Sequence, residues 1–102
     1  MNILLKPTSF EWDKGNTGKN NKHSVQDQEA EEIFFDERKV IAKDVLHSGT
    51  EKRYILLGKT KKGRLLYTVF TIRKEKLRII SSRDVNKREE HLYEKSIART
   101  KV

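Results

Sequence analysis

The sequence predicts an α+β fold in which an antiparallel β-sheet meander packs against two N-terminal helices and a C-terminal helix. Three observations lead to this prediction. Apolar residues near the N-terminus recur at helical spacing, the centre holds three strand-like runs with short connections, and a capping pattern precedes the last helix. At 102 residues the chain is expected to form one domain, 1–102, with a loose tail over 1–7 and the folded part over 8–98.

The N-terminal third is expected to hold a short strand and two helical segments. "SFEWD" alternates Phe10 and Trp12 with polar residues, as short strands do. "KGNTGKNNKH" is rich in glycine and asparagine, which disfavour helix, so only tertiary packing could hold it helical. "VQDQEAEEIFF" is a better helix because its apolar residues approximate a stripe that excludes the acidic ones. The stripe comprises Val25, Ala30, Ile33 and Phe34.

Strand signals dominate the centre of the chain. "KRYILLGKT", "RLLYTVFTIR" and "KLRIISSR" are rich in β-branched and aromatic residues. The links "KTKKGR" and "RKEK" are short enough for hairpin loops, and Gly63 can adopt a positive φ there. With an irregular strand over 39–43, the expected order is β-α-α-β-β-β-β-α, with the helices on one side of the sheet.

The last helix is expected to begin near residue 86. Asn86 is followed three residues later by Glu89, which has the form of a capping box. Val85, Leu92 and Ile97 give this segment a mixed face that could rest on the sheet.

The charge of the chain is strongly basic and unevenly distributed. The net charge is +8, and residues 1–36 hold 4 basic and 7 acidic side chains, whereas residues 37–102 hold 19 and 8. An excess of this size favours polyanionic or acidic partners. Any anion site is therefore expected in the second part of the chain.

Several classes of function find no support in the sequence. The chain has no cysteine, and His23, His47 and His91 do not stand at the close spacing of a zinc motif, so we expect no metal site. The glycines form no nucleotide-binding loop, and no serine has a nucleophile-elbow context, so no cofactor is expected. No apolar run approaches the roughly 20 residues that span a membrane, and we expect a cytoplasmic protein.

Arginines near the strand ends are the candidate phosphate-binding groups. Strict alternation places Arg83 on the same face as Ile79 and Ser81. Arginines at strand ends usually project into water. The alternative for each of these arginines is therefore that it is solvated and binds no phosphate. Arg83, Tyr93 and a basic residue at the start of the last helix could together bind one phosphate.

RNA cleavage is a reaction that suits such a cluster. The 2′-hydroxyl attacks the neighbouring phosphate, and arginines can stabilise the negative charge of the transition state. His23 is the obvious titratable group, and Glu89 or Tyr93 could be the second. Two structural alternatives stay open, because His23 could meet the last carbonyls of a helix and Glu89 could serve only as a cap.

The chain resembles the BrnT family of bacterial toxins from about Phe10 to Lys95. The resemblance is carried by "FEWD", "KHSV", "EAEEIFF", "HSGTEKRYILLGKT", "GRLLYTVFTIR", "RIISSRD" and the pair Glu89 and Tyr93, with their order and spacing kept. It implies a RelE-like ribonuclease, the toxin of a type II system, which halts translation by cutting RNA without metal or organic cofactor. The sequence departs from the family pattern at Ser82, where alanine is common.

The resemblance also implies partners. They are the RNA substrate and a BrnA-type antitoxin that is encoded next to the toxin and carries a DNA-binding domain. Operator DNA would be contacted only through the antitoxin, and the complex would be a heterotetramer of two toxins and two antitoxins. The family's prominent positions fall on His23, Glu51, Arg53, Arg64, Arg83, Glu89 and Tyr93.

We therefore predict an endoribonuclease toxin in which arginines hold the phosphate and the other site residues supply proton transfer and orientation. The predicted catalytic residues are His23, Arg64, Arg83, Glu89 and Tyr93, and the predicted RNA-binding residues are Lys22, Arg53, Arg73, Arg78, Lys87 and Arg88. One alternative is a non-catalytic basic module that only binds nucleic acid. Another is that the basic face chiefly docks an acidic antitoxin helix.

Overall fold

The computed structural model describes residues 9–44, 49 and 51–100, with side chains as far as Ser96. The predicted loose tail over 1–7 and His47 lie outside the described residues. The elements, in chain order, are the 3₁₀ helix η1 (Lys19–His23), α1 (Asp27–Glu32), the 3₁₀ helix η2 (Ile33–Phe35), β1 (Val40–Asp44), β2 (Arg53–Lys59), β3 (Leu65–Arg73), β4 (Lys76–Asp84) and α2 (Lys87–Thr100).

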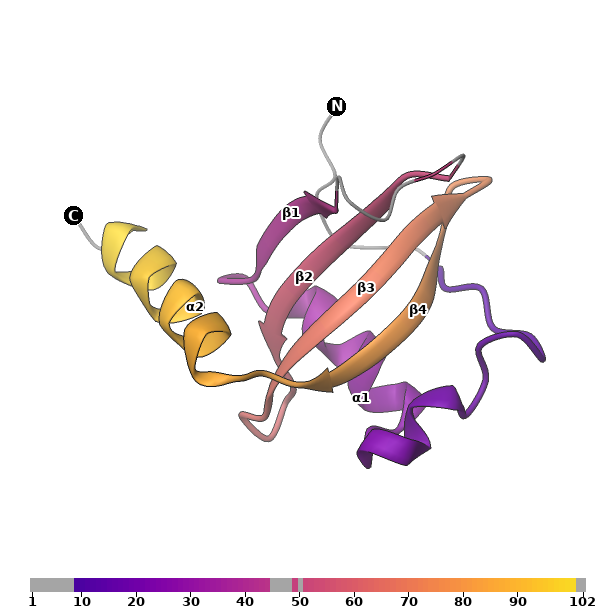
Figure 1. Ribbon diagram of the computed structural model, residues 1–102, viewed down its shortest axis with the longest axis horizontal. Coiled ribbons are helices and arrows are strands. Elements are labelled where there is room, and N and C mark those ends of the chain that lie inside the picture. The colour runs from indigo at the N-terminus through magenta and orange to yellow at the C-terminus, as the bar shows by residue number, and fades with distance from the viewer. Residues whose placement is uncertain (1–8, 45–48, 50, 101–102) are drawn as a thin grey trace.

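The four strands form one antiparallel sheet in the order β1-β2-β3-β4, which confirms the predicted α+β meander (Figure 1). The expected hairpin loops are present. Gly63, in the loop before β3, has φ +85°, a value that costs glycine little because it has no Cβ. Lys74 and Glu75 turn the chain between β3 and β4 with positive φ angles of 48° and 68°.

The free edge of β4 is covered by the segment before α1. The short strand expected in "SFEWD" is only a parallel bridge between Phe10 and Leu77. The glycine-rich segment that follows forms turns and then η1, which is held by buried asparagines. The Nδ2 of Asn16 donates to the carbonyl of Ile79 at 3.1 Å, and the amide of Ser82 donates to Asn20 Oδ1 at 2.8 Å. Two edge groups of β4 thus find partners in side chains instead of a further strand.

Asn20→Ala is expected to destabilise the fold by about 1–3 kcal/mol, because the buried amide of Ser82 would lose its acceptor. Urea unfolding of Asn20→Ala and of the control variant Asn21→Ala measures this loss in the free energy of unfolding. Asn21 is the neighbouring, exposed asparagine, and its substitution should change the free energy of unfolding little. Equal losses in the two variants would show that the bond to Ser82 contributes nothing.

The core lies between one face of the sheet and the segment η1-α1-η2. The predicted helical stripe is confirmed, since Val25, Ala30, Ile33 and Phe34 are all buried there against Leu56, Leu66, Phe70 and Ile79. The ring of Phe34 meets those of Phe10 and Phe70 edge-on, with centroids 5.4 Å and 5.0 Å apart. A Cβ at Gly58 would stand 2.8 Å from the carbonyl oxygen of Ile33, so η2 can approach β2 this closely only over a glycine.

A β-bulge interrupts the pairing of β3 with β4. Val69 pairs with Ser81, whereas Phe70 pairs with Ile79, so Ile80 is an extra residue. Ile79 therefore faces the core, while Ser81 and then Arg83 face the opposite side of the sheet. The expected alignment of Arg83 with Ile79 is wrong, because strict alternation does not continue through a bulge.

The expected placement of all helices on one side of the sheet is not confirmed. α1 lies across one face, whereas α2 projects beyond the β1 side (Figure 1). Leu92 and Lys95 of α2 border a groove whose floor belongs to the other sheet face, with Leu57 and Tyr67. Both faces of β2 carry apolar residues, so the second face can also receive a helix. Within the described residues, no helix is long and apolar enough to cross a membrane.

Candidate active site

Arg83 and Glu89 meet in a two-pronged ion pair where β4 ends and α2 begins. The Nη1 and Nη2 atoms of Arg83 lie 2.9 Å from Oε1 and Oε2 of Glu89, respectively. The guanidinium also stacks on Tyr67, its register neighbour on β3, at 4.1 Å from the ring centroid. The side chain of Arg83 is 39% exposed and that of Glu89 is 13% exposed. The arginine is thus fixed in orientation but open to solvent.

Glu89 also caps α2, as its spacing from Asn86 predicted. Its Oε1 accepts the amide of Asn86 at 3.0 Å, and its own amide donates to Asn86 Oδ1 at 2.8 Å. Both bonds of a capping box are therefore present. The cap fixes the carboxylate at the strand-helix junction, where it can pair with Arg83, so the capping and pairing roles coexist in one residue.

The pKa shifts of Glu89 and Arg83 both favour the charged form of the side chain at neutral pH. Burial tends to raise the pKa of Glu89, but the bonds from Arg83 and from the amide of Asn86 outweigh it and lower this pKa below its ordinary value. The bond with Glu89 raises the pKa of Arg83. Burial raises the pKa of the Tyr67 phenol. A carboxylate, a guanidinium and a neutral phenol therefore lie together.

Arg83 retains hydrogen-bonding capacity that a ligand can use. A guanidinium carries five N–H groups. The bonds to Glu89 and to the carbonyl of Asp84 occupy three of them. Its Nε–H and one Nη2–H find no acceptor among the residues that the structure describes, and these two can bind an anion.

Arg64 differs, because each of its five N–H groups has an acceptor. Nε and Nη2 bind the two carboxylate oxygens of Asp84 at 2.7 Å and 3.0 Å. Nη2 also reaches the carbonyl of His23, and Nη1 reaches the carbonyl of Ser24 at 2.7 Å and Glu29 Oε1 at 3.2 Å. The bonds from Arg64 lower the pKa of Asp84. Arg64 thus ties the end of η1 to the end of β4.

His23 is the last residue of η1, and its side chain is exposed. Its carbonyl accepts a hydrogen bond from Arg64, which also binds Asp84, the residue that follows Arg83 in the chain. The backbone that carries the imidazole is therefore fixed near the strand end that carries Arg83. The predicted role of His23 in proton transfer stays a prediction.

Tyr93 lies in a different environment from the one expected. Its ring is buried, its hydroxyl donates to Asp36 Oδ2 at 2.6 Å, and Lys59 Nζ lies 5.6 Å from the ring centroid. Burial, followed by the bond to Asp36, raises the pKa of Tyr93 well above its ordinary value. Tyr93 anchors α2 to the end of η2, and the structure brings it together with Asp36 and Lys59, not with Arg83.

The predicted RNA-binding residues fall into two groups at opposite ends of the β3-β4 hairpin. Near Arg83, the first turn of α2 exposes Lys87 and Arg88, and Lys22 is exposed on η1. At the other end, Arg73 pairs with Glu51. The remaining two are Arg78, paired with Glu11 and Asp13, and Arg53, opposite Asp44 in the register of β1 and β2.

The two groups are well separated. Tyr67 and Arg73 are six positions apart on β3, which corresponds to about 20 Å. Arg73 and Arg78 at the far end, moreover, already bind carboxylates. The group around Arg83 is therefore the better candidate for the reaction site, and a strand of several nucleotides would be needed to reach both.

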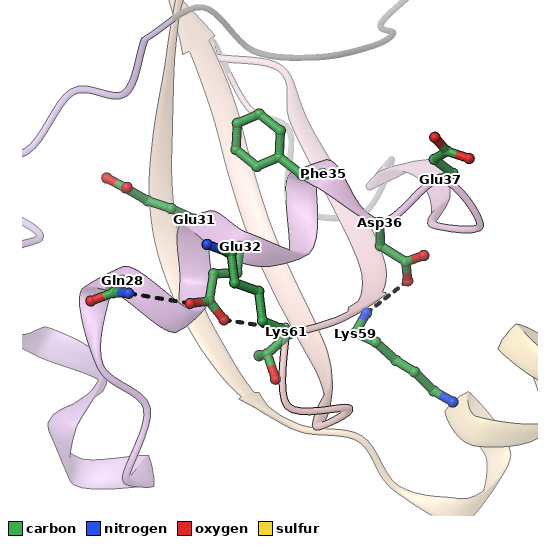
Figure 2. A pocket seen from close by; sticks show the side chains of 9 residues that line it. Gln28, Glu31, Glu32, Phe35, Asp36, Glu37, Lys59 and Lys61 are labelled. Atoms are coloured by element: carbon green, nitrogen blue, oxygen red, sulfur yellow. Dashed lines mark hydrogen bonds between the residues drawn. The ribbon is translucent and has the colours of Figure 1, made fainter.

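A groove of about 770 Å³ between η2 and the β2-β3 loop is a second candidate site (Figure 2). Its lining holds the carboxylates of Glu31, Glu32, Asp36 and Glu37 against only two lysines, Lys59 and Lys61, together with the half-exposed ring of Phe35. Such a surface repels a polyanion. Of the described residues, no three histidine or acidic side chains group closely enough to hold a metal ion.

Comparison with known families decides which protein class this geometry belongs to. A family described as "Ribonuclease toxin, BrnT, of type II toxin-antitoxin system" matches residues 12–89, more than half of the chain. The chain belongs to the BrnT family. It is therefore a ribonuclease toxin of a type II toxin–antitoxin system, as its resemblance predicted. Comparison with individual curated proteins finds no match.

The segment that matches the BrnT family contains the ion pair described above. It ends at Glu89, so it includes Arg83 and its partner, but it stops before Tyr93. His23 and Arg64 also fall within it.

Ser82, the departure from the BrnT pattern noted in the sequence, is explained by the structure. Its side chain is fully buried, and its hydroxyl shares a 2.6 Å hydrogen bond with that of Thr68 on β3. The serine is therefore satisfied inside the core, where an unpaired hydroxyl would be costly. This position does not alter the groups of the candidate site.

Sequence reasoning missed Tyr67 as a member of the candidate site. Tyr67 supports the guanidinium of Arg83 from the next strand. The connection depends on the register of β3 against β4, which the bulge displaces. The pairing can be found by matching β3 to β4 residue by residue, starting at the turn formed by Lys74 and Glu75. If β4 is allowed one extra residue, this alignment pairs Tyr67 with Arg83.

Proposed function

We propose that this BrnT toxin is an endoribonuclease whose reaction centre is the ion pair of Arg83 and Glu89 on the ring of Tyr67. The observation that carries the proposal is the guanidinium itself, which is held by a carboxylate and an aromatic ring yet keeps two N–H groups for a ligand. This arrangement suits a planar, two-pronged contact with a phosphate. The basic α2 start, with Lys87 and Arg88, adds attraction for the RNA backbone.

In the proposed reaction, the 2′-hydroxyl of one nucleotide attacks its own 3′-phosphate. Glu89 accepts the proton of the attacking hydroxyl, while Arg83 stabilises the charge that develops on the phosphorane oxygens. The negative charge of a phosphate bound to the two free N–H groups of Arg83 raises the proton affinity of the nearby Glu89 carboxylate, which makes it a stronger base. The bond from phosphorus to the 5′-oxygen then breaks, and the protonated imidazole of His23 donates the proton to that oxygen. The products are a 2′,3′-cyclic phosphate and a 5′-hydroxyl end.

We assign Arg64 and Tyr93 to positioning. A direct contact of Arg64 with the phosphate would require it to release one of its five acceptors, whereas its present bonds hold the backbone of His23 beside β4. The bond of Tyr93 to Asp36 fixes the helix that carries Glu89. Both residues would act through the groups that they hold.

The same proposal includes the biological setting. Cleavage of RNA without a metal ion would inhibit translation, and a BrnA-type antitoxin encoded next to the toxin would neutralise it in a complex of two toxins and two antitoxins. The membership of the BrnT family supports an antitoxin partner. Operator DNA would be contacted through that antitoxin alone.

The test is RNA cleavage by the purified toxin in EDTA. We expect cleavage with 5′-hydroxyl and 2′,3′-cyclic phosphate ends, at a rate that added Mg²⁺ leaves unchanged within about twofold, since no step of the proposed chemistry uses a metal. Salt-sensitive RNA binding without any cleavage would favour the alternative, a non-catalytic nucleic-acid-binding module.

A further inference from the structure

An apolar groove of about 470 Å³ lies between α2 and the sheet face that α1 does not cover. Its floor is formed by residues of three strands: Val40, Ala42, Ile55, Leu57 and Tyr67. Glu89 and Leu92 of α2 line its other side. The groove therefore continues to the ion pair of Arg83 and Glu89, because Tyr67 and Glu89 belong to both.

α2 does not close this groove. Leu92 borders it and is still 54% exposed, and Ala42 on the floor is exposed as well. Tyr93, one position further along, is buried and bonded to Asp36. The helix is thus anchored by one face, while Leu92 on another face stays open to water and joins the apolar floor in one contiguous patch. Contiguous exposed apolar patches are typical of interaction sites.

The chemistry of the floor favours a protein ligand over a nucleobase. Single-stranded RNA is bound largely by stacking of bases on exposed aromatic rings. Four of the five floor residues are aliphatic, and one face of the only aromatic ring, that of Tyr67, is already covered by Arg83 at 4.1 Å. Aliphatic side chains of another protein match such a surface, and a groove beside a helix is a common seat for an amphipathic helix.

We propose that this groove docks an amphipathic helix of the antitoxin, which places aliphatic side chains on the floor and an acidic side chain on Arg83. The inference rests on the proposed function for the identity of the partner. The charge at the groove supports an acidic segment, because Arg83 has two N–H groups to offer and Lys95 lies exposed on the α2 side. A helix bound in this way covers Arg83 and so blocks RNA directly.

The test measures the affinity of the toxin for the protein encoded by the adjacent antitoxin gene, by calorimetry with purified partners. Leu92→Glu is expected to raise Kd at least about tenfold, because it puts a charge in the apolar contact. Phe35→Glu is the matched control. Phe35 is similarly exposed, at 52%, but lies in the acidic groove of η2, so its substitution should leave Kd within about twofold. Neither residue belongs to the proposed reaction centre, so both variants should still cleave RNA.

The outcomes separate the groove from the catalytic proposal. A weaker complex for Leu92→Glu supports the groove even if the wild-type toxin cuts no RNA, in which case only the catalytic proposal fails. Unchanged affinity overturns the groove, as does an equal loss for Phe35→Glu. If Leu92→Glu loses RNA cleavage but binds the antitoxin normally, the groove serves RNA and the inference is wrong. Ala42→Glu, which charges the exposed floor on β1, replaces Leu92→Glu if that variant does not fold.

Discussion

Arg83→Ala is expected to lower kcat for RNA cleavage by about 10²-fold or more. Removing one donor that stabilises an anionic transition state commonly costs about 10²–10³ in kcat, and this substitution removes the group that we propose binds the phosphate. Single-turnover cleavage of a short RNA measures the effect. Arg83→Lys keeps the charge but loses the planar fork, so we expect an intermediate rate.

The matched control for this prediction is Arg38→Ala, which removes the same charge from an exposed position before β1. It should change the rate by less than about threefold, since only the general attraction for RNA is reduced. Thermal unfolding of Arg83→Ala is measured in parallel, because Glu89 loses its partner in a largely buried position. Full activity in a folded Arg83→Ala protein would remove Arg83 from the reaction.

Local patterns predicted the fold where each element depended on its own residues. The capping box of Asn86 and Glu89 and the hairpin turn at Gly63 both occur as the sequence indicated. The way in which the free edge of β4 is covered could not be predicted from local patterns. Asn16 and Asn20 lie in a segment with poor helix propensity, and their function is to satisfy backbone groups of Ile79 and Ser82, more than 60 residues away.

The candidate site was predictable only in part for the same reason. Arg83 and Glu89 are six residues apart across one strand-helix junction, so the sequence could bring them together. Arg64 was predicted to bind the phosphate with Arg83, but each arginine has its own carboxylate. The partners of Arg64 and Tyr93, Asp84 and Asp36, are set by tertiary packing. Nothing in the local pattern indicated that these two side chains were already engaged.

Glu89→Gln separates the structural role of this residue from its chemical role. Glutamine can replace glutamate in a capping box, so α2 should stay capped and the melting temperature should change little. It cannot accept the proton of the 2′-hydroxyl, and kcat should fall by about 10²–10⁴-fold. RNA affinity should hold or rise, because the N–H groups of Arg83 would no longer be bound to a charged carboxylate.

Glu90→Gln is the matched control, since Glu90 is the exposed neighbour on the same turn of α2 and loses the same charge. If Glu89→Gln cleaves RNA at the wild-type rate, Glu89 is only a helix cap and a partner of Arg83. Another residue is then the general base. A fall in kcat without a fall in RNA affinity cannot come from a displaced helix, because a displaced helix would also move Lys87 and Arg88 away from the RNA backbone that we propose they bind. The two measurements together therefore test whether one carboxylate both builds the site and takes the proton.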